Sequence, residues 1–346
     1  MSSQPHAAST TSSDDFFRLE PASLTPALLG ESPFWHPLEQ CLYYVDIPGK
    51  ALFRLDNRAE TPTRWALNDE PGCVVPLTDG KLLIPQRNGL WRFDPATGAY
   101  ERLLDPPYDA SKRRFNDGKA DAKGRLWVGT IDDAREPESA LYCLRDGAFE
   151  QVLDGITVSN GLAWSPDGRT MYWADTKAHE VYRLSFDADT GTVGARETFI
   201  SFDKRAPEQP LETYGGRPDG AAVDVEGAYW IAMMEGQQLL RLSPSGEVLT
   251  RVELPVRCAT MPTFGGADMC TLFVTTAREA QRGRARRSAL GRLRVEDAGA
   301  GGGVAGAVRA LGRLSARGGD RCCVRTARRS GRVSVPKADE QGSGEP

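Results

Sequence analysis

Short apolar runs, each preceded by turn residues, recur along the chain at nearly even intervals. Their first residues are Cys41, Lys81, Arg125, Thr170, Ala228 and Cys270, with spacings of 40, 44, 45, 58 and 42 residues. A second apolar run follows each one, as in ALFRLD from Ala51 and EVYRLS from Glu180. Paired short strands at a period of about 45 residues are typical of β-propeller blades. The pattern therefore predicts an all-β fold, a six-bladed β-propeller.

Acidic or amide residues occur at one repeated offset before four of these strands. Glu31 and Asn160 lie ten residues before Cys41 and Thr170, and Asn116 and Asp219 lie nine before Arg125 and Ala228. The first strand of each propeller blade lines the central channel, so equivalent positions converge at one end of it. We expect these four side chains to meet in one polar pocket.

Two carboxylates and two amides offer mainly oxygen ligands. Such a set suits one hard divalent cation, Ca²⁺, Mg²⁺ or Mn²⁺. Zinc also accepts carboxylates but more often binds His or Cys. The alternative interpretation is that each Asx residue beside a Gly only shapes a turn. Four residues at one repeat offset favour the cation site.

Arg114 lies two residues before Asn116 in RRFNDGK. Alternation along a strand places both side chains on one face. Its guanidinium could bind a substrate oxygen or offset a carboxylate. The alternative is a solvated basic pair, Arg113 and Arg114, at the start of a strand.

Several ordered motifs carry a resemblance to a known family. GESPFW (30–35), RFNDGK (114–119), SNGLAWSPDG (159–168) and RPDGAAVD (217–224) resemble the senescence marker protein/regucalcin/gluconolactonase family, over about residues 27 to 277. The resemblance, closest to bacterial sugar lactonases, implies a six-bladed propeller with one catalytic divalent metal (Ca, Zn, Mg or Mn) in the channel. It implies hydrolysis of a sugar (aldono-)lactone to the aldonic acid by a metal-activated water.

The same resemblance implies roles for individual residues. Glu31, Asn160 and Asp219 would bind the metal, and Asp219 would also act as the catalytic acid/base. Arg114 and Asn116 would bind the sugar lactone. A further acidic substrate contact of the family, after the GT of the third repeat, has two candidates here, Asp133 and Glu136.

Two other function classes are compatible with a propeller. One is a hydrolase of the paraoxonase or strictosidine-synthase kind, and the other is a non-catalytic propeller that binds a cation or a protein. Convergent carboxylates and amides favour the two hydrolases, because a binding module would instead expose apolar residues on a rim. No GxSxG elbow and no HExxH motif is present.

Composition and charge limit the kinds of partner that the protein is expected to bind. The 346 residues carry a net charge of −4, which predicts no nucleic-acid partner, and no apolar run reaches a membrane span. The small-molecule lactone is therefore the expected partner. The scattered cysteines have no CxxC or zinc-ligand spacing, with only Cys322 and Cys323 adjacent, so we expect a reduced, cytoplasmic protein.

The two ends of the chain differ from the repeats. Residues 1–15 are Ser/Thr-rich and predict a disordered tail, followed by a lactonase domain over 16–277. From 278 to 346 the chain is rich in Arg, Gly and Ala, and Phe273 is its last aromatic residue. We interpret this segment as a disordered basic tail or as the product of out-of-frame translation. Either way the last blade is expected to be incomplete, with SALGRLRVE (288–296) as a degraded strand.

Overall fold

The computed structural model describes residues 18–57, 59–278 and 290–294. These residues form 24 β-strands and one short 3-10 helix, η2 (Leu211–Thr213). The prediction of an all-β protein is confirmed. No helix in the described part of the chain is long and apolar enough to cross a membrane.

The strands form six four-stranded sheets, five of which follow chain order. The first sheet contains β2 (Gly30–His36), β3 (Cys41–Asp46), β4 (Ala51–Asp56) and β5 (Thr63–Ala66). The second contains β6 (Val75–Pro76), β7 (Leu82–Gln86), β8 (Gly89–Phe93) and β9 (Tyr100–Leu104). The third contains β10 (Arg113–Ala120), β11 (Leu126–Asp132), β12 (Ser139–Arg145) and β13 (Ala148–Ile156).

The remaining sheets continue the same antiparallel order. The fourth contains β14 (Ser159–Trp164), β15 (Thr170–Asp175), β16 (Glu180–Asp187) and β17 (Thr192–Ser201). The fifth contains β18 (Arg217–Val223), β19 (Tyr229–Met234), β20 (Gln238–Leu242) and β21 (Val248–Glu253). The last contains β22 (Ala259–Gly265), β23 (Thr271–Thr276), β24 (Leu290–Arg294) and β1 (Arg18–Ser23).

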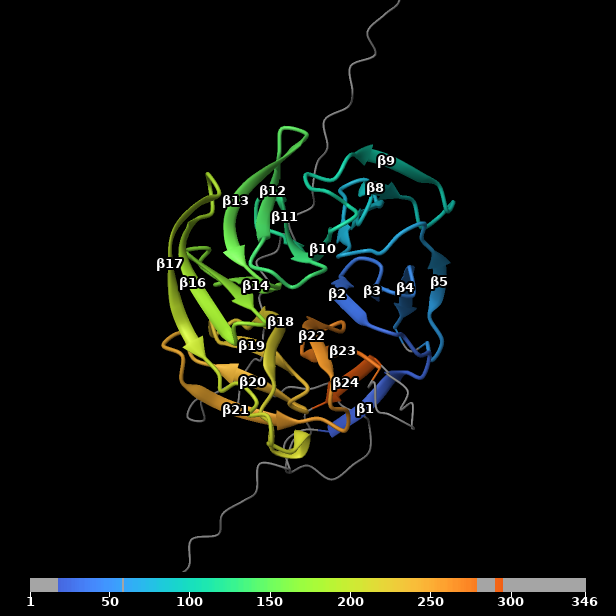
Figure 1. The fold of residues 1–346 in the computed structure, drawn as a ribbon. Coiled ribbons are helices and arrows are strands. Elements are labelled where there is room, and N and C mark those ends of the chain that lie inside the picture. Colours follow the sequence, from blue (N-terminus) through green and yellow to red (C-terminus); the bar gives the residue numbers. More distant parts are fainter. Residues whose placement is uncertain (1–17, 58, 279–289, 295–346) are drawn as a thin grey trace, which may run out of the picture.

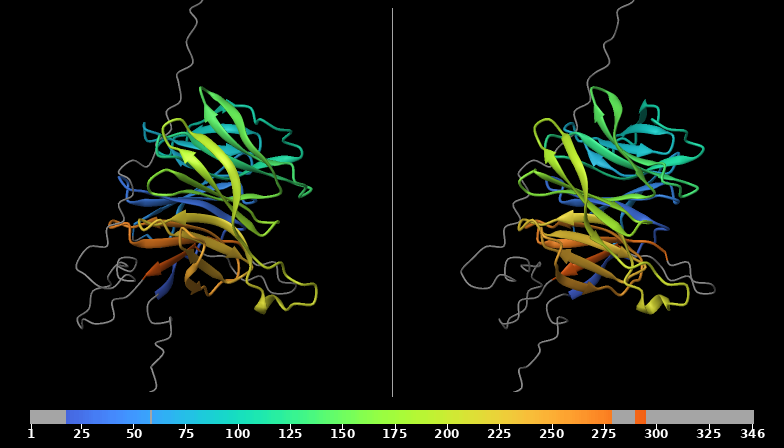
Figure 2. Two further views of the ribbon diagram at one scale, coloured as in Figure 1. Left: turned by 90° about the vertical axis from the view of Figure 1, so that its left-hand side faces the viewer. Right: turned by 60° about the vertical axis from the view of Figure 1, so that its left-hand side comes forward.

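The sheets are arranged radially as in a β-propeller. Strands β2, β10, β14, β18 and β22 lie near the centre, and β5, β9, β13, β17, β21 and β1 lie at the periphery (Figure 1). The views of Figure 2 show that the segment carrying η2, between β17 and β18, projects beyond the sheets. This insertion explains why the interval from Thr170 to Ala228 is the longest in the repeat.

The last sheet joins both ends of the described chain. β24 pairs antiparallel with β23 on one side and with β1 on the other. The sheet is therefore complete with four strands, whereas the sequence led us to expect an incomplete one. Five residues of the atypical 278–346 segment belong to this sheet, although the predicted lactonase domain ended at 277. The predictions for 1–15 and for the rest of 278–346, Cys322 and Cys323 included, fall outside the described residues.

Buried tryptophans on second strands hold neighbouring sheets together. Trp127, Trp173 and Trp230 are almost completely buried, on β11, β15 and β19. Burial of one such apolar side chain stabilises the fold by roughly 1.5–3 kcal/mol. Each indole N–H also donates a hydrogen bond, which avoids the cost of an unpaired buried donor.

An aspartate directly after the inner strand fixes the turn in two of the sheets. Oδ1 of Asp121 and of Asp224 each accepts two backbone N–H groups of its own turn. Oδ2 accepts the indole N–H of Trp127 in one sheet and of Trp230 in the other, both at 2.9 Å. One side chain therefore joins the local turn to the packing between sheets.

Candidate functional site

Four predicted site residues lie on inner strands, next to irregularities in strand pairing. Glu31 is on β2, Asn116 on β10, Asn160 on β14 and Asp219 on β18. In each strand the register with the second strand shifts at or directly beside that residue. A β-bulge bends its strand and redirects the side chains beside it. Four equivalent bulges thus act at four equivalent positions.

The backbone at three of these four bulges takes a left-handed conformation. Ser32, Asp117 and Gly161, each following a site residue, have φ angles of 48°, 44° and 63°. At Gly161 a Cβ atom would lie 2.4 Å from the hydroxyl oxygen of Tyr229. That hydroxyl donates a 2.8 Å hydrogen bond to the Gly161 carbonyl. The Asn160–Gly161 pair therefore forms a bulge inside a strand and is no hairpin tip.

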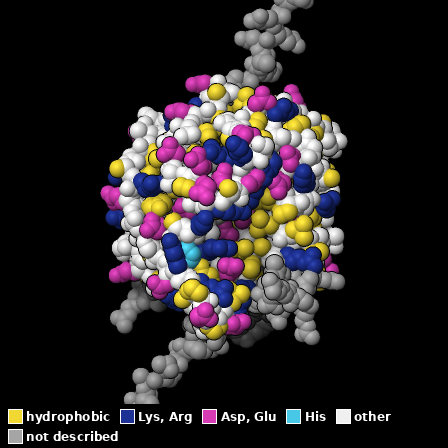
Figure 3. Space-filling model, in the orientation of Figure 1, with side chains coloured by type: hydrophobic (Ala, Val, Ile, Leu, Met, Phe, Trp, Pro, Cys, Tyr) yellow, Lys and Arg dark blue, Asp and Glu magenta, His cyan; other side chains and the backbone are white. Residues whose placement is uncertain are grey.

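The structure brings five predicted side chains to one cavity of about 330 Å³, which we call the channel cavity. The predicted residues that line it are Glu31, Arg114, Asn116, Asn160 and Asp219. All five are buried. Lys and Arg side chains are concentrated near the centre of the face seen in Figure 3, where the inner strands of Figure 1 meet.

A chain of hydrogen bonds connects these side chains. Arg114 donates from a terminal nitrogen to Oδ1 of Asn116 at 2.7 Å, as expected for two residues on one strand face. The amide nitrogen of Asn116 donates to Oδ1 of Asn160 at 2.9 Å. Asn160 in turn donates to Oγ1 of Thr176 at 2.8 Å. These contacts fix both amide orientations and point the Asn160 oxygen toward Asn116. Of the two interpretations of Arg114, the solvated one is wrong, because the side chain is buried.

The two carboxyl groups in the cavity are strongly perturbed. Burial raises the pKa of Asp219 to about 8, with a contribution from the nearby charge of Asp117. Burial also raises the pKa of Glu31 well above its usual range, and the charge of Asp219 adds to this effect. Within the described ranges neither carboxylate forms an ion pair with Lys or Arg. A cation between them would favour the ionised forms and so oppose both shifts.

The chemistry of these donors fits a hard divalent cation. Among the described residues the Glu31 carboxylate accepts one hydrogen bond, a 3.2 Å contact from the Ser32 backbone N–H, so lone pairs remain for a ligand. The Asn160 oxygen has a second lone pair beyond the one that Asn116 uses. No cluster of three or more His, Cys, Asp or Glu suited to a metal occurs among the described residues. The predicted set holds two such residues, and an amide oxygen is its third donor.

Neither candidate for the further acidic contact lines the channel cavity. Both carboxylate oxygens of Asp133 are held by Arg87 at 3.0 Å. Glu136 is exposed. Arg135, between them, lines the cavity instead and has a φ of 61°. The loop therefore presents a cation where an acidic residue was expected.

Four further polar residues line the channel cavity without having been predicted: Arg135, Thr176, Lys177 and Arg217. Thr176 and Lys177 directly follow β15, so their place at the end of a second strand is set by the fold. Arg217 is the first residue of β18 and lies two positions before Asp219, the same spacing as Arg114 before Asn116. This shared spacing is the feature of the sequence from which Arg217 could have been predicted.

Comparison with known proteins places this site in a family. Residues 29–278 match the family described as SMP-30/Gluconolactonase/LRE-like region. The chain is 40% identical over 256 residues to 6-deoxy-6-sulfogluconolactonase of Pseudomonas putida, covering 73% of this chain and 85% of that protein. It is 34% identical over 255 residues to a pentonolactonase of Haloferax volcanii, covering 73% and 83%.

Solved structures agree with these sequence matches. A calcium-binding protein, regucalcin, from Agrobacterium tumefaciens superposes with a TM-score of 0.73 at 29% identity, over 80% of this chain and 93% of that one. The family match spans all the channel-cavity residues named above. The chain therefore belongs to the SMP-30/gluconolactonase/LRE-like family.

Proposed function

We propose that this protein hydrolyses a sugar lactone to the corresponding aldonic acid with the help of one divalent cation. The observation that carries the proposal is the meeting of two buried carboxylates, two hydrogen-bonded amides and a buried arginine in one cavity. The names of the relatives support it, because a sulfogluconolactonase and a pentonolactonase are enzymes that open sugar lactones.

Glu31, Asn160 and Asp219 would hold the cation, since their side chains supply oxygen donors from three neighbouring positions of the cavity. When bound, the cation would polarise the lactone carbonyl and acidify a water molecule. The calcium-binding regucalcin structure supports calcium as one candidate ion, and Zn²⁺, Mg²⁺ and Mn²⁺ are the others. We also infer that each of the six sheets is one blade, so that β1 and β24 close a six-bladed ring around this site.

The remaining residues would position substrate and move the proton. Asp219 accepts a proton from the attacking water, and later returns it to the ring oxygen as the C–O bond breaks. The Arg114 guanidinium is buried and hydrogen-bonded to Asn116, so it is held in place to bind sugar hydroxyl oxygens. Burial lowers the pKa of Arg114 to about 10, which still leaves it charged at neutral pH.

The expected compartment follows from the cysteines. Cys41, Cys73 and Cys143 are buried and carry free thiols in the described part of the chain. This supports a reducing location such as the cytoplasm.

The test is hydrolysis of aldonolactones by protein stripped with a chelator, followed as acid release after subtraction of the spontaneous rate. We expect activity to return on addition of a divalent cation and to be lost in Asp219→Ala. Glu136→Gln is the matched control, because Glu136 is an exposed carboxylate outside the cavity. A folded, metal-loaded protein that is silent on all lactones would refute the proposal in favour of a non-catalytic binding propeller. Turnover that persists after Asp219→Ala would refute the role of Asp219.

A further inference from the structure

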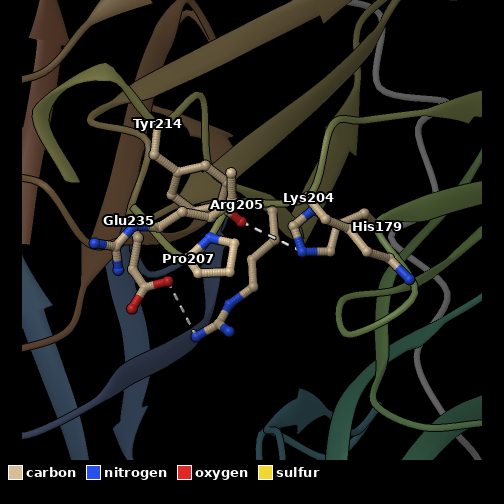
Figure 4. A pocket seen from close by; sticks show the side chains of 8 residues that line it. His179, Lys204, Arg205, Pro207, Tyr214 and Glu235 are labelled. Carbon is tan, nitrogen blue, oxygen red and sulfur yellow. Dashed lines mark hydrogen bonds and ion pairs between the residues drawn. The ribbon is translucent and has the colours of Figure 1, made fainter. Parts of the chain in front are cut away.

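A second cavity adjoins the channel cavity and shares Arg217 with it. This second cavity, of about 400 Å³, we call the basic cavity. Six of its lining residues matter here: His179, Lys204, Arg205, Tyr214, Arg217 and Glu235. Figure 4 shows their side chains around the hollow. Lys204, Arg205 and Tyr214 come from the insertion between β17 and β18 that lengthens the sequence repeat.

Positive charge exceeds negative charge in the basic cavity. Lys204, Arg205 and Arg217 contribute three cations, and Glu235 contributes one carboxylate. The channel cavity adds Arg114, Arg135 and Lys177 to its two carboxylates. A divalent cation bound to those two carboxylates would leave both cavities strongly positive.

Several hydrogen-bond donors of these cationic side chains have no partner among the described residues. Lys204 forms no hydrogen bond or ion pair with other described residues. The Nε atom of Arg217 is buried and has no hydrogen-bond partner there either. Its terminal nitrogen reaches Glu235 only at 3.4 Å. Arg205 donates only from Nε, to the Gln209 carbonyl. Most of their donors therefore remain available to a ligand.

The wall of the basic cavity is buried and ordered by its own contacts. The Tyr214 hydroxyl and the Nε2 atom of His179 lie 3.3 Å apart, and both side chains are buried (Figure 4). Burial lowers the pKa of His179, and the charges of Arg217 and Lys204 lower it further. The imidazole is thus neutral and faces two cations.

We propose that the basic cavity binds an anionic substituent on the far end of the lactone, of the sulfonate, phosphate or carboxylate class, through Lys204, Arg205 and Arg217. This inference rests on the proposed function, because the lactone ring then occupies the channel cavity. Arg217, which lines both cavities, lies between the ring and the anion. The replacement of an acidic contact by Arg135 agrees with this, since a carboxylate there would repel such a substrate.

The experiment compares kcat/KM for gluconolactone with that for its 6-phospho, 6-deoxy-6-sulfo and 6-carboxylate analogues. We expect the native protein to prefer at least one anionic lactone, with the order of rates distinguishing the three anions. In Lys204→Ala and Arg217→Gln the preference should fall by about tenfold to a hundredfold. Hydrolysis of the neutral lactone should be unchanged in Lys204→Ala, whose side chain is exposed. The control Lys112→Ala removes an exposed lysine that lines neither cavity.

A binding measurement separates this inference from the proposed function. Calorimetry with 6-phosphogluconate, 6-deoxy-6-sulfogluconate and gluconate needs no turnover. Tighter binding of a 6-substituted acid, which carries a second anionic group, than of gluconate, lost in Lys204→Ala, would support the basic cavity even if no lactone were hydrolysed. Equal binding of the three acids, together with equal kcat/KM for the neutral and the anionic lactones, would overturn the inference. An equal loss of kcat/KM for the neutral and the anionic lactones in Lys204→Ala would also overturn the inference.

Discussion

The amide nitrogen of Asn116 donates a 2.9 Å hydrogen bond to Oδ1 of Asn160, across 44 residues of sequence. The contact joins two inner strands, β10 and β14. It connects a proposed substrate residue to a proposed metal ligand and leaves one lone pair of the Asn160 oxygen for a cation. Asn116 and Thr176 together fix the orientation of the Asn160 side chain, so replacing either residue should disturb it.

Replacing Thr176 with Val should weaken metal binding without removing a proposed ligand. Oγ1 of Thr176 accepts the Asn160 amide at 2.8 Å, and Val has the same shape without that acceptor. Loss of an orienting partner typically costs about 10–100-fold in metal affinity. Calorimetric titration of chelator-stripped protein with Ca²⁺ or Mn²⁺ measures the change. Thr130→Val is the matched control, because Thr130 is buried and hydrogen-bonded but lines neither cavity. Equal effects of the two variants would contradict the orienting role.

The stability of the metal-free protein should fall as pH rises. Burial raises the folded-state pKa of Asp219 to about 8 and raises that of Glu31 as well. Unfolded carboxyl groups titrate near pH 4, so between about pH 4 and 8 the folded protein binds more protons than the unfolded one. The free energy of unfolding then decreases as the pH rises across this window.

Urea denaturation in the presence of a chelator, at about pH 5 and about pH 8, measures this difference. Asp219→Asn should make the profile shallower, because one of the two titrating carboxyl groups is removed. Saturating divalent cation should reverse the slope, since it binds the ionised carboxylates. Stability that rises with pH in the metal-free protein would show that these groups are ionised in the fold.

Gly161→Ala should destabilise the protein and disturb the site. Gly161 has a φ of 63°, and the added methyl would lie 2.4 Å from the Tyr229 hydroxyl and 2.8 Å from Cβ of Ala174. We expect a loss of about 2–4 kcal/mol in the free energy of unfolding, together with weaker metal binding. Gly80→Ala is the control, because Gly80 has a φ of 81° with no atom within 4 Å of the added methyl. The Gly80→Ala variant should lose only about 1 kcal/mol in the free energy of unfolding.

Asp224→Ala should cost about 3–5 kcal/mol of stability. The Asp224 carboxylate accepts hydrogen bonds from the Trp230 indole at 2.9 Å and from Nε of Arg241 at 2.8 Å. Its removal leaves a buried guanidinium with Glu226 as its remaining acidic partner. Chemical denaturation measures the loss, and Asp167→Ala, at an exposed turn, should change stability by less than about 1 kcal/mol. Comparable losses in the two variants would refute a special role for Asp224.

The repeated pattern of residues was enough to predict an all-β propeller and to identify side chains that meet. Strand alternation fixes which face a residue occupies, and the repeat fixes its distance along the blade. That is why Glu31, Asn116, Asn160 and Asp219 could be chosen together and are found in one cavity. Arg114 followed from the same alternation, through its spacing from Asn116.

Other features depended on contacts between distant segments. Asp133 is held by Arg87, 46 residues away, so that Arg135 occupies the cavity wall. β24 lacks a clear strand pattern, yet it completes the last sheet because β1 and β23 both offer it unpaired backbone groups.

The sequence by itself thus determined the strand repeat and the chemical character of the channel, because both follow from the local period of the side chains. Only the tertiary structure decided the closure of the last sheet, the bulges beside the proposed ligands and the presence of Lys204 and Arg217 in the lining of one cavity. Those features depend on contacts between segments that are far apart in the chain, and such contacts have no fixed spacing in the sequence.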